Sequence, residues 1–363
     1  RSGDFVKKRV PQSNLEKKEQ KLALKLLLPA FIVLALVAIY PLGDVLFTSF
    51  TDREFAGGAE VKTNFIGFEN YANLLGITIV ELPPVLDENE NQVINEKTGE
   101  PEFERAVKVL PRDPHRYKEL FQYDWFGKRY VVGARDPVFL KSVGNTLIFS
   151  LFSVFIETVL GIFIALVVNS NFKGRGALRT TMLVPWAVIT VVSARIWEYM
   201  LNPGTSGFFN MILFRLGISD GQISFLTDSF WQMPSMIMVD VWKTTPFMAL
   251  LILAGLQLIP KELYEAAEVD GASGFKRFFK ITLPLLKPTI AVALVFRTLD
   301  ALRVFDVFQV LLGKKMYSMA SYNYTQLINY RQMGYSSAVG MIIFILIAIF
   351  AVIYIKMMGV DSK

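Results

Sequence analysis

Charged residues recur at every third position within one hydrophobic segment near the C-terminal end of the sequence: Arg297, Asp300, Arg303 and Asp306. Ionisable residues at membrane depth cost about 2.5–3.5 kcal/mol each on insertion scales and usually face a bundle interior or a water-filled path. On a helix, neighbours three apart can pair, and successive members rotate by about 60°. Two interpretations stay open. The series lines a substrate path, with Asp300 and Arg303 nearest mid-span, or it is a self-neutralising ladder that holds the helix to its neighbours.

The preceding hydrophobic segment carries a second polar group, in which Trp242 and Lys243 follow Asp240. Aromatic and hydrogen-bonding side chains together suit sugar rings, which makes Trp242 and Lys243 candidates for the same path. A Trp near the end of a span is also a common interfacial anchor. Lys243 has two alternative partners, Asp240 and an aspartate of the later series. Farther upstream, Arg195 and Glu198 have the spacing of an ordinary local ion pair.

A polar stretch interrupts the hydrophobic runs at residues 261–272. Residues 261–270 form a short run of strong helix formers, and Gly271 stands where a helix favours a left-handed residue. Ala266 and Ala267 leave part of this helix bare, so the surface of a partner could approach its backbone closely. The alternative is an amphipathic loop helix that lies on a membrane surface.

The composition indicates a polytopic membrane protein. Apolar residues make up 53% of the 363 residues, and the mean hydropathy is +0.40, which is high for a soluble protein. The sequence has no cysteine and a single histidine, His115, which excludes disulfides, thiolate metal sites and histidine clusters. The formal charge of +6 fits an excess of Lys and Arg on the cytoplasmic side better than it fits nucleic-acid binding.

The sequence contains no nucleotide-binding or hydrolytic motif. A phosphate loop needs a glycine-rich run that ends in Lys and then Ser or Thr. The nearest stretch, residues 127–129, lacks both the upstream glycine and the hydroxyl residue. Nucleophile-elbow and zinc-protease motifs are also missing from the sequence. We therefore expect that this chain does not hydrolyse ATP itself and has no catalytic residue and no cofactor of its own.

Hydrophobic runs near the length of a bilayer-spanning helix recur six times. The first could be mistaken for a signal sequence, but its length and the later runs favour a retained helix. The expected organisation is an N-terminal segment at 1–25, a first span at 26–50, an insert at 51–138, and a transmembrane core at 139–363 with a loop at 259–287. The other predicted spans are 140–169, 177–201, 230–258, 288–312 and 337–358.

The charges of the short loops predict the orientation. Lysine and arginine concentrate between the second and third spans and at 259–287, whereas the loop 202–229 contains only Arg215. The loop 313–336 follows this distribution of positive charge less clearly. By the positive-inside rule, both chain ends and the loop 259–287 face the cytoplasm.

Residues 51–138 are charged and unlike a membrane segment, and they predict a small, mostly β domain outside the cytoplasm. Residues 85–94 have the pattern of two short strands around a polar turn, residues 97–101 that of a second turn, and residues 130–132 that of a strand. A poorly ordered loop is the alternative. At the N-terminus a helix is expected from Asn14, after a basic segment that is either helical or an unstructured tail.

The polar stretch resembles the cytoplasmic signature loop of ABC-importer permeases, and the residues that carry the resemblance are Glu265-Ala266-Ala267, Asp270-Gly271-Ala272, Ile281, Leu283 and Pro284. Within that family the sequence is similar to carbohydrate-importer permeases of the maltose and glycerol-phosphate type. The supporting stretches are 297–308 (RTLDALRVFDVF), 183–185 and 65–71. The likeness covers nearly all of the chain outside 77–135.

The resemblance implies an all-α polytopic fold, the six-helix fold of type I ABC-importer permeases, in a bacterial or archaeal cytoplasmic (inner) membrane. It also implies partners: a second, usually different permease chain, two ATPase subunits that bind ATP and Mg, and an external substrate-binding protein. Maltose-type permeases carry a larger insertion in the place of the insert here, and it contacts the binding protein.

The resemblance also assigns roles in the loop 259–287. Glu265 becomes the ion-pair contact with the ATPase, Ala266 and Ala267 permit close docking, Asp270 belongs to the same coupling set, and Gly271 makes the turn. An ion-coupled secondary carrier that uses the charged fifth span is the alternative function. Such carriers often show two related halves, and no internal repeat is evident in this sequence.

Overall fold

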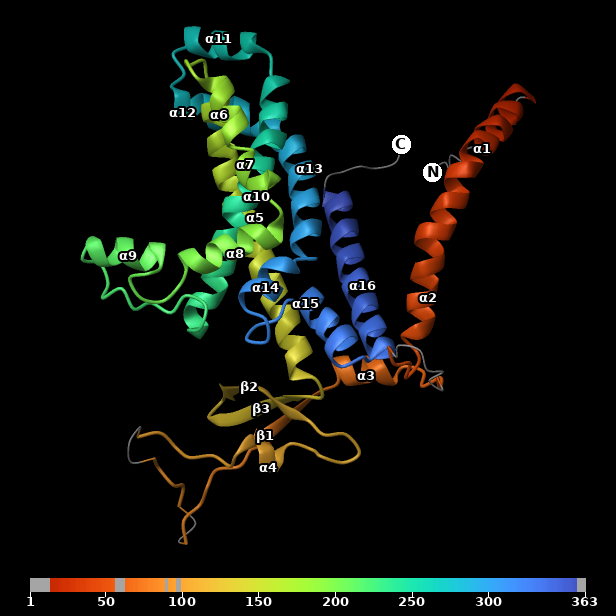
Figure 1. Ribbon diagram of the computed structural model, residues 1–363, viewed down its shortest axis with the longest axis vertical. Coiled ribbons are helices and arrows are strands. Elements are labelled where there is room, and N and C mark those ends of the chain that lie inside the picture. Colours follow the sequence, from red (N-terminus) through yellow and green to blue (C-terminus); the bar gives the residue numbers. More distant parts are fainter. Residues whose placement is uncertain (1–13, 56–62, 89–90, 96–98, 358–363) are drawn as a thin grey trace, which may run out of the picture.

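The computed structural model describes residues 14–55, 63–88, 91–95 and 99–357. Long helices run side by side through the middle of the molecule, and a small sheet lies at one end (Figure 1). Four helices form the core: α5 (Pro137–Asn169), α10 (Ser229–Gln257), α13 (Leu283–Ala301) and α16 (Met333–Met357). The predicted fold class, an all-α membrane protein with a small β insert, is confirmed.

Five helical segments of the described chain are long and apolar enough to cross a membrane, and one bent helix pair makes a sixth candidate. The first span joins α1 (Asn14–Leu34), a π-helical turn η1 (Ala35–Ile39) and α2 (Tyr40–Thr48). The prediction of a helix from Asn14 onward is confirmed, and the basic segment before it lies outside the described residues. The last predicted span, 337–358, corresponds to α16, which begins four residues earlier at Met333.

The span predicted at 177–201 is a bent helix pair and not one straight helix. The helices α6 (Arg175–Thr181) and α7 (Val184–Ala187) end at an angle of 92° to α8 (Thr190–Met200). Val188 and Ile189 have extended ψ angles of 135° and 133°, which breaks the helix. The Nζ atom of Lys243 donates to the carbonyl of Val188 over 2.5 Å, so a carbonyl exposed by the break is satisfied. The short helix α9 (Phe208–Arg215) follows.

The span predicted at 288–312 corresponds to a longer helical segment, Gly274–Leu311. It starts earlier, because α12 (Gly274–Arg277) and the π-helical turn η2 (Phe278–Thr282) lead directly into α13. It is interrupted near its other end, because α13 stops at Ala301 and α14 (Asp306–Leu311) begins after a break. Ser318 Oγ donates to the carbonyl of Val304 over 2.6 Å, which satisfies a group that a continued helix would have used itself. The four charged residues therefore do not share one helix.

The insert contains an antiparallel sheet with the strand order β1-β3-β2, flanked by the short helices α3 (Glu69–Leu75) and α4 (Ala106–Val109). The strands are β1 (Ile77–Leu82), β2 (Lys118–Trp125) and β3 (Lys128–Ala134). The strand predicted at 130–132 is confirmed within β3. The apolar core of the insert contains Leu82, Ala106, Leu110 and Val131.

The pairing predicted across 85–94 is present, but without regular strands: the N–H of Val93 donates to Val85 O and that of Asp87 to Asn91 O, each over 2.9 Å. This part of the insert forms isolated bridges, such as Leu86 with Gln92 and Pro84 with Phe103. Proline cannot donate to a ladder, and Pro83, Pro84 and Pro101 flank the segment. Parts of the two predicted turns, 89–90 and 96–98, lie outside the described residues, and Gly99 has a φ of +70°.

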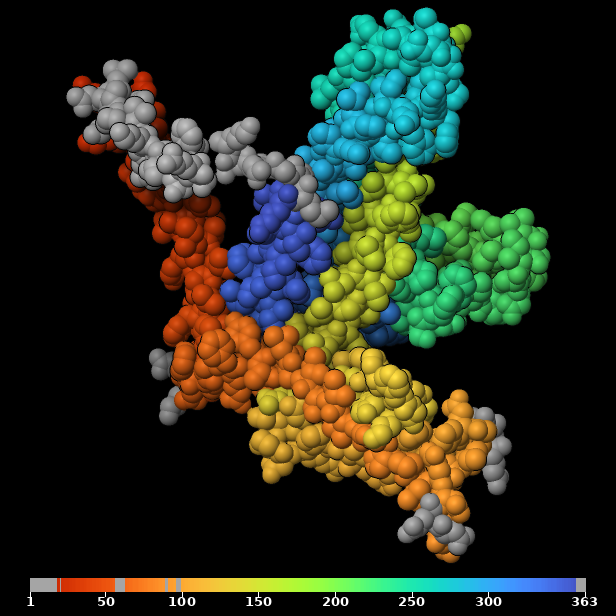
Figure 2. All heavy atoms as spheres, turned by 180° about the vertical axis from the view of Figure 1, so that it is seen from behind, coloured from red at the N-terminus to blue at the C-terminus, as the bar shows by residue number. Residues whose placement is uncertain are grey.

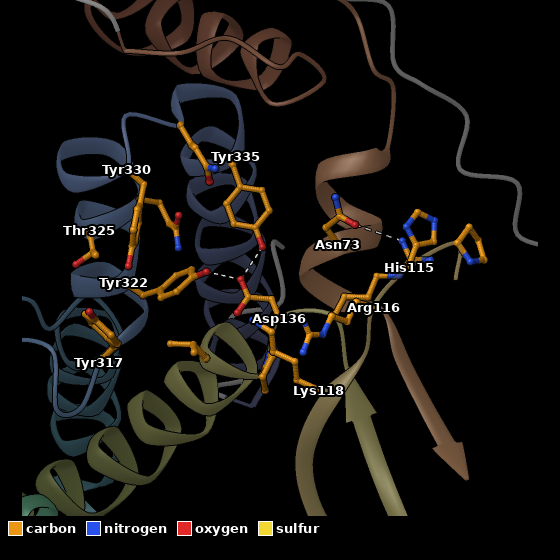
Figure 3. Close-up of a pocket in the computed structure, with 16 residues that line it drawn as sticks. Asn73, His115, Arg116, Lys118, Asp136, Tyr317, Tyr322, Thr325, Tyr330 and Tyr335 are labelled. Carbon is orange, nitrogen blue, oxygen red and sulfur yellow. Dashed lines mark hydrogen bonds between the residues drawn. The ribbon is translucent and has the colours of Figure 1, made fainter. Parts of the chain in front are cut away.

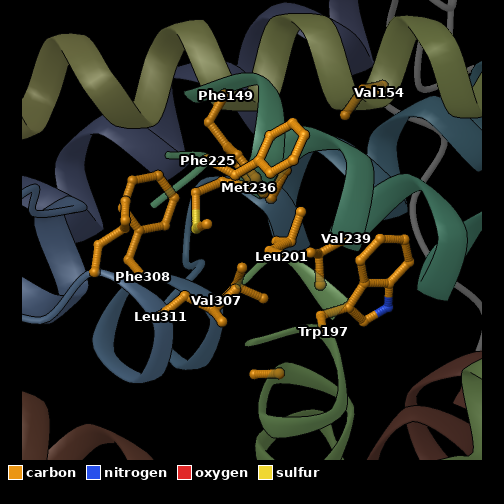
Figure 4. Packing of buried hydrophobic residues seen from close by; sticks show 13 residues of the cluster. Phe149, Val154, Trp197, Leu201, Phe225, Met236, Val239, Val307, Phe308 and Leu311 are labelled. Carbon is orange, nitrogen blue, oxygen red and sulfur yellow. The ribbon is translucent and has the colours of Figure 1, made fainter. Parts of the chain in front are cut away.

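Side chains from α5, α8, α10 and α14 meet in the largest buried apolar cluster (Figure 4). Phe149 and Phe308 pack edge to face with ring centroids 5.3 Å apart, and both are fully buried. This cluster fixes the short helix α14 against the long helices despite the break before it. The helix α15 (Met319–Tyr324) and the π-helical turn η3 (Thr325–Asn329) then lead to α16.

The two ends of the molecule differ in character. The helix α11 (Lys261–Val269), the first turn of α1 and the last turn of α16 lie toward one end, and the sheet lies at the other (Figure 1). Figure 2 shows α1 as an arm that stands away from the core and joins it near the insert. All described side chains from Lys21 to Phe47 are exposed, so another molecule must cover this apolar arm.

We expect Gly255→Val to destabilise the core, because α10 and α13 approach closely at this position. A Cβ atom at Gly255 would lie 2.5 Å from Thr289 Oγ1 and 2.8 Å from Thr289 Cβ. Overpacking of this kind costs about 1–3 kcal/mol. Thermal unfolding in detergent measures the effect, with Gly144→Val as the control, since no atom lies within 4 Å of a Cβ there. Equal unfolding midpoints for the two variants would contradict the close approach.

Candidate functional site

A buried ion cluster joins three of the core helices. Arg297 on α13 donates Nε and Nη2 to the carboxylate of Glu157 on α5, the latter bond being 3.0 Å to Oε1. Arg297 Nη2 also donates to Asp240 Oδ2 on α10. The side chains of Arg297 and Glu157 are 3% and 0% exposed. Removal of one partner from such a cluster would leave a buried charge without compensation.

Asp300 extends this cluster toward the surface. Arg297 Nη1 donates to Asp300 Oδ2 over 3.0 Å, and the Asp300 side chain is 63% exposed. Arg303 is equally exposed, and its Nη2 lies 4.0 Å from Asp300 Oδ1. Of the predicted series, Arg297 therefore holds helices together, whereas Asp300 and Arg303 are accessible.

A cavity of about 170 Å³, here called the charged cavity, lies beside the ion cluster. Both helix breaks contribute to its wall, through Thr190 at the start of α8 and through Phe305 before α14. All but one of the predicted path residues line it: Lys243, Arg297, Asp300, Arg303 and Asp306. The structure thus brings these residues together in one polar space.

Trp242 is not part of this cavity. It lines a separate, mostly apolar cavity of about 710 Å³ together with Trp197, and the two indole rings meet edge to face at 5.6 Å. Successive residues of a helix point in different directions, so Trp242 and Lys243 leave α10 on different faces. The grouping of Trp242 with the charged residues, which the sequence suggested, is not found.

Lys243 has a different role from either predicted ion pair. It is 9% exposed, and its Nζ donates to the carbonyls of Val188 at 2.5 Å and Trp186 at 3.4 Å. No ion pair of Lys243 is found within the described part of the chain. The predicted local pair of Arg195 with Glu198 is confirmed at 2.6 Å.

Glu157 is a site residue that sequence reasoning missed. It is the one acidic residue between Pro137 and Asn169, and ionisable residues within spans are functional candidates by default. Thr244 Oγ1 also donates to Glu157 Oε1 over 2.5 Å, which links the carboxylate directly to α10. The isolated acid in a long apolar run was the available signal.

The loop 259–287 contains the predicted short helix, α11, which ends in the predicted turn. Gly271 has a φ of +72°. The N–H of Ala272 donates to Ala267 O over 2.8 Å and the N–H of Gly271 donates to Glu268 O over 3.0 Å. These two bonds form a Schellman motif, which needs a left-handed residue at Gly271.

Two side-chain contacts hold α11 against the following helices. The hydroxyls of Tyr264 and Thr282 lie 2.9 Å apart, and Arg277 Nη1 donates to Glu268 Oε2 over 3.2 Å. Glu265 and Ala266 are exposed and Ala267 is half-buried. The helix is therefore fixed on one side and open on the other.

Residues 157–358 match the family described as the binding-protein-dependent transport system inner membrane component. The chain belongs to that family. The trehalose transport system permease protein of Mycobacterium tuberculosis is 32% identical over 343 residues, which cover 94% of this chain and 90% of that protein. The trehalose/maltose transport system permease protein of Thermococcus litoralis is 48% identical over 232 residues, 62% of this chain and 76% of that protein.

Two solved structures have a fold similar to that of this chain. A chain of a bacterial ABC transporter for the import of alginate, an acidic polysaccharide, has the same fold, with a TM-score of 0.66 at 22% identity over 97% of this chain and all of that one. A bacterial alginate ABC transporter in complex with an alginate pentasaccharide-bound periplasmic protein gives 0.57 at 28% identity, over 61% and 78%. The predicted resemblance to carbohydrate ABC-importer permeases is confirmed, and nothing here supports the ion-coupled carrier.

We expect Arg297→Gln to lower the free energy of unfolding by about 3–5 kcal/mol, because it leaves the carboxylates of Glu157 and Asp240 buried without a cation. Arg303→Gln removes the same charge at an exposed position and should change stability by no more than about 0.5 kcal/mol. Chemical or thermal unfolding in detergent measures both. Adding Glu157→Gln to Arg297→Gln should recover part of the loss, and no recovery would show that the cluster is not the cause.

Proposed function

We propose that this permease forms, with a second permease chain, the path by which an ATP-driven importer moves a sugar or sugar derivative across the membrane. The observation that carries the proposal is the charged cavity, which lies between core helices of an importer fold and beside two helix breaks. Irregular backbone at membrane depth is tolerated where it lines a cavity or is buried in protein. Transport, rather than chemistry on the substrate, is the use that fits this arrangement.

The charged cavity suits a hydroxyl-bearing substrate. Asp300 accepts hydrogen bonds and Arg303 donates them, and both are accessible from the space that Asp306 and Thr190 also line. Charged groups make the strongest hydrogen bonds to polar ligands. The named relatives are permeases for trehalose and maltose, which supports a sugar as the substrate class.

The exposed side of α11 is the proposed docking site for an ATPase subunit, which would bind ATP and Mg. Glu265 offers a charge there, and the small Ala266 leaves the backbone open. Large apolar side chains surround this helix and are uncovered in the single chain: Leu258, Val269 and Phe275 are 81%, 89% and 76% exposed. A rigid α11, held by Tyr264 and Glu268, would pass the movement of the ATPase to α13.

The remaining partners follow from the two other open surfaces. The apolar arm α1 and α2 would be covered by lipid and by the second permease chain. The insert, at the end opposite α11, would face an external substrate-binding protein (Figure 2). With α11 in the cytoplasm, as the loop charges predict, both chain ends would also be cytoplasmic.

We expect Glu265→Ala to reduce ATP-driven sugar uptake by about tenfold or more, because a charged contact at the docking site is lost. The assembled transporter is reconstituted in liposomes, and uptake and substrate-stimulated ATP hydrolysis are measured together. Asp220→Ala, which removes an exposed carboxylate from the loop between α9 and α10, is the control. Wild-type uptake by Glu265→Ala would remove the coupling role of this residue.

For the charged cavity, we expect Asp300→Asn to raise the KM for sugar uptake by about tenfold, since a charged acceptor for substrate hydroxyls is lost. Initial uptake rates over a range of sugar concentrations give the KM. Asp220→Asn, in the loop between α9 and α10 and outside the charged cavity, should leave the KM unchanged. An unchanged KM in Asp300→Asn would favour a purely structural role for the charged series.

A further inference from the structure

A second polar cavity, here called the insert cavity, lies at the end of the molecule opposite α11. It has a volume of about 560 Å³ and lies where the insert meets the helical core, between Asn73 of α3, the start of α5 and the segment from η3 to the start of α16 (Figure 3). Pockets for small ligands have volumes of about 300–1,000 Å³. The insert cavity is therefore large enough for one or two sugar rings.

Positive charge dominates the lining of the insert cavity. Arg116, Lys118 and Arg135 line it together with His115. Arg135 donates to the Tyr117 hydroxyl and to Asn73 Oδ1, each over 3.3 Å. Arg116 and Lys118 make no ion pair and no side-chain hydrogen bond within residues 14–55, 63–88, 91–95 and 99–357. Two cations without partners at one cavity favour an anionic ligand.

The acidic residue of the lining, Asp136, is already engaged. The hydroxyls of Tyr322 and Tyr335 both donate to its Oδ2, the latter over 2.6 Å (Figure 3). The N–H of Phe139 donates to Oδ1 over 2.9 Å. Burial raises the pKa of Tyr322, so its phenol remains a donor at neutral pH. These bonds fix the wall, and they leave the charge of Arg116 and Lys118 uncompensated.

One buried amide points to a ligand independently of the charges. Gln326 in η3 lines the insert cavity and is 8% exposed. Its side chain has no hydrogen-bond partner among the described residues. The polar atoms of this amide are open to the cavity, so a ligand with hydroxyl groups could satisfy both its donors and its acceptor. The rings of Tyr317 and Tyr330, also in the lining, offer the aromatic surface that sugar rings favour.

We propose that the insert cavity binds an anionic polyol of at most two sugar rings, with its carboxylate, sulfonate or phosphate against Arg116 and Lys118 and its hydroxyls against Gln326. This inference rests on the proposed function in one respect: that function sets the side of the membrane from which the ligand arrives. A free acidic sugar and the headgroup of phosphatidylglycerol share this chemistry. The insert cavity is separate from the charged cavity, since the two have no lining residue in common.

Calorimetric titration of D-glucuronate into the permease–ATPase complex, without ATP, tests the site. The complex is held in phosphatidylcholine nanodiscs, and D-glucose is the neutral control ligand. Lys118→Gln and Gln326→Leu should each weaken glucuronate binding by about tenfold. Lys314→Gln removes an exposed positive charge outside the cavity and should leave the affinity unchanged. A thermal unfolding midpoint like that of the wild type shows that each variant is folded.

A second set of nanodiscs that contain phosphatidylglycerol distinguishes the two ligand sources. If glucuronate binds more weakly in these nanodiscs than in phosphatidylcholine alone, the lipid headgroup competes for the insert cavity and is its natural occupant. If glucuronate binds equally in both, the natural occupant is a free acidic sugar. No glucuronate binding in phosphatidylcholine, equal binding of glucose, or an unchanged affinity in the folded Lys118→Gln variant would each overturn the proposal. Because no ATP is present, these results do not depend on coupling through α11, which the uptake assay tests separately.

Discussion

Arg297 and the carboxylates around it set the arrangement of the helical core. One guanidinium serves Glu157 on α5, Asp240 on α10 and Asp300 on its own helix, so three elements far apart in the sequence must meet at one point. Buried ion pairs add little net stability over apolar residues, but a broken one is expensive. The cluster therefore acts mainly as a constraint on which helix faces can pack together, and the charged cavity lies where this constraint meets accessible residues.

The loop around α11 could be predicted in detail because its signals are local. Strong helix formers, a glycine at the position of the left-handed residue and the two bonds that close the helix all lie within one short stretch, and no distant partner is needed to form the turn. The same holds for the strand around Tyr130, whose aromatic and β-branched residues themselves favour a strand. For these elements, local preference and final structure agree.

The two helix breaks could not be predicted, because the groups that satisfy the freed carbonyls come from elsewhere in the chain. Lys243 serves Val188, and Ser318 serves Val304. The series of charged residues looked like a ladder only while a continuous helix was assumed. Five of the six predicted path residues nevertheless line the charged cavity, and Trp242 does not, because one residue along a helix changes the face. Glu157 was overlooked, although a single acidic residue in a long apolar run is just as costly in a membrane and indicates a site in the same way.

The order of synthesis gives the ion cluster a further consequence. Glu157 precedes Arg297 by 140 residues and Asp240 precedes it by 57, so both acids are made and must enter the membrane before their cation exists. Until the fifth span has been made, α5 and α10 each carry a carboxylate whose later partner, Arg297, does not yet exist. The helix contacts that Arg297 joins are therefore complete only after the fifth span has been made.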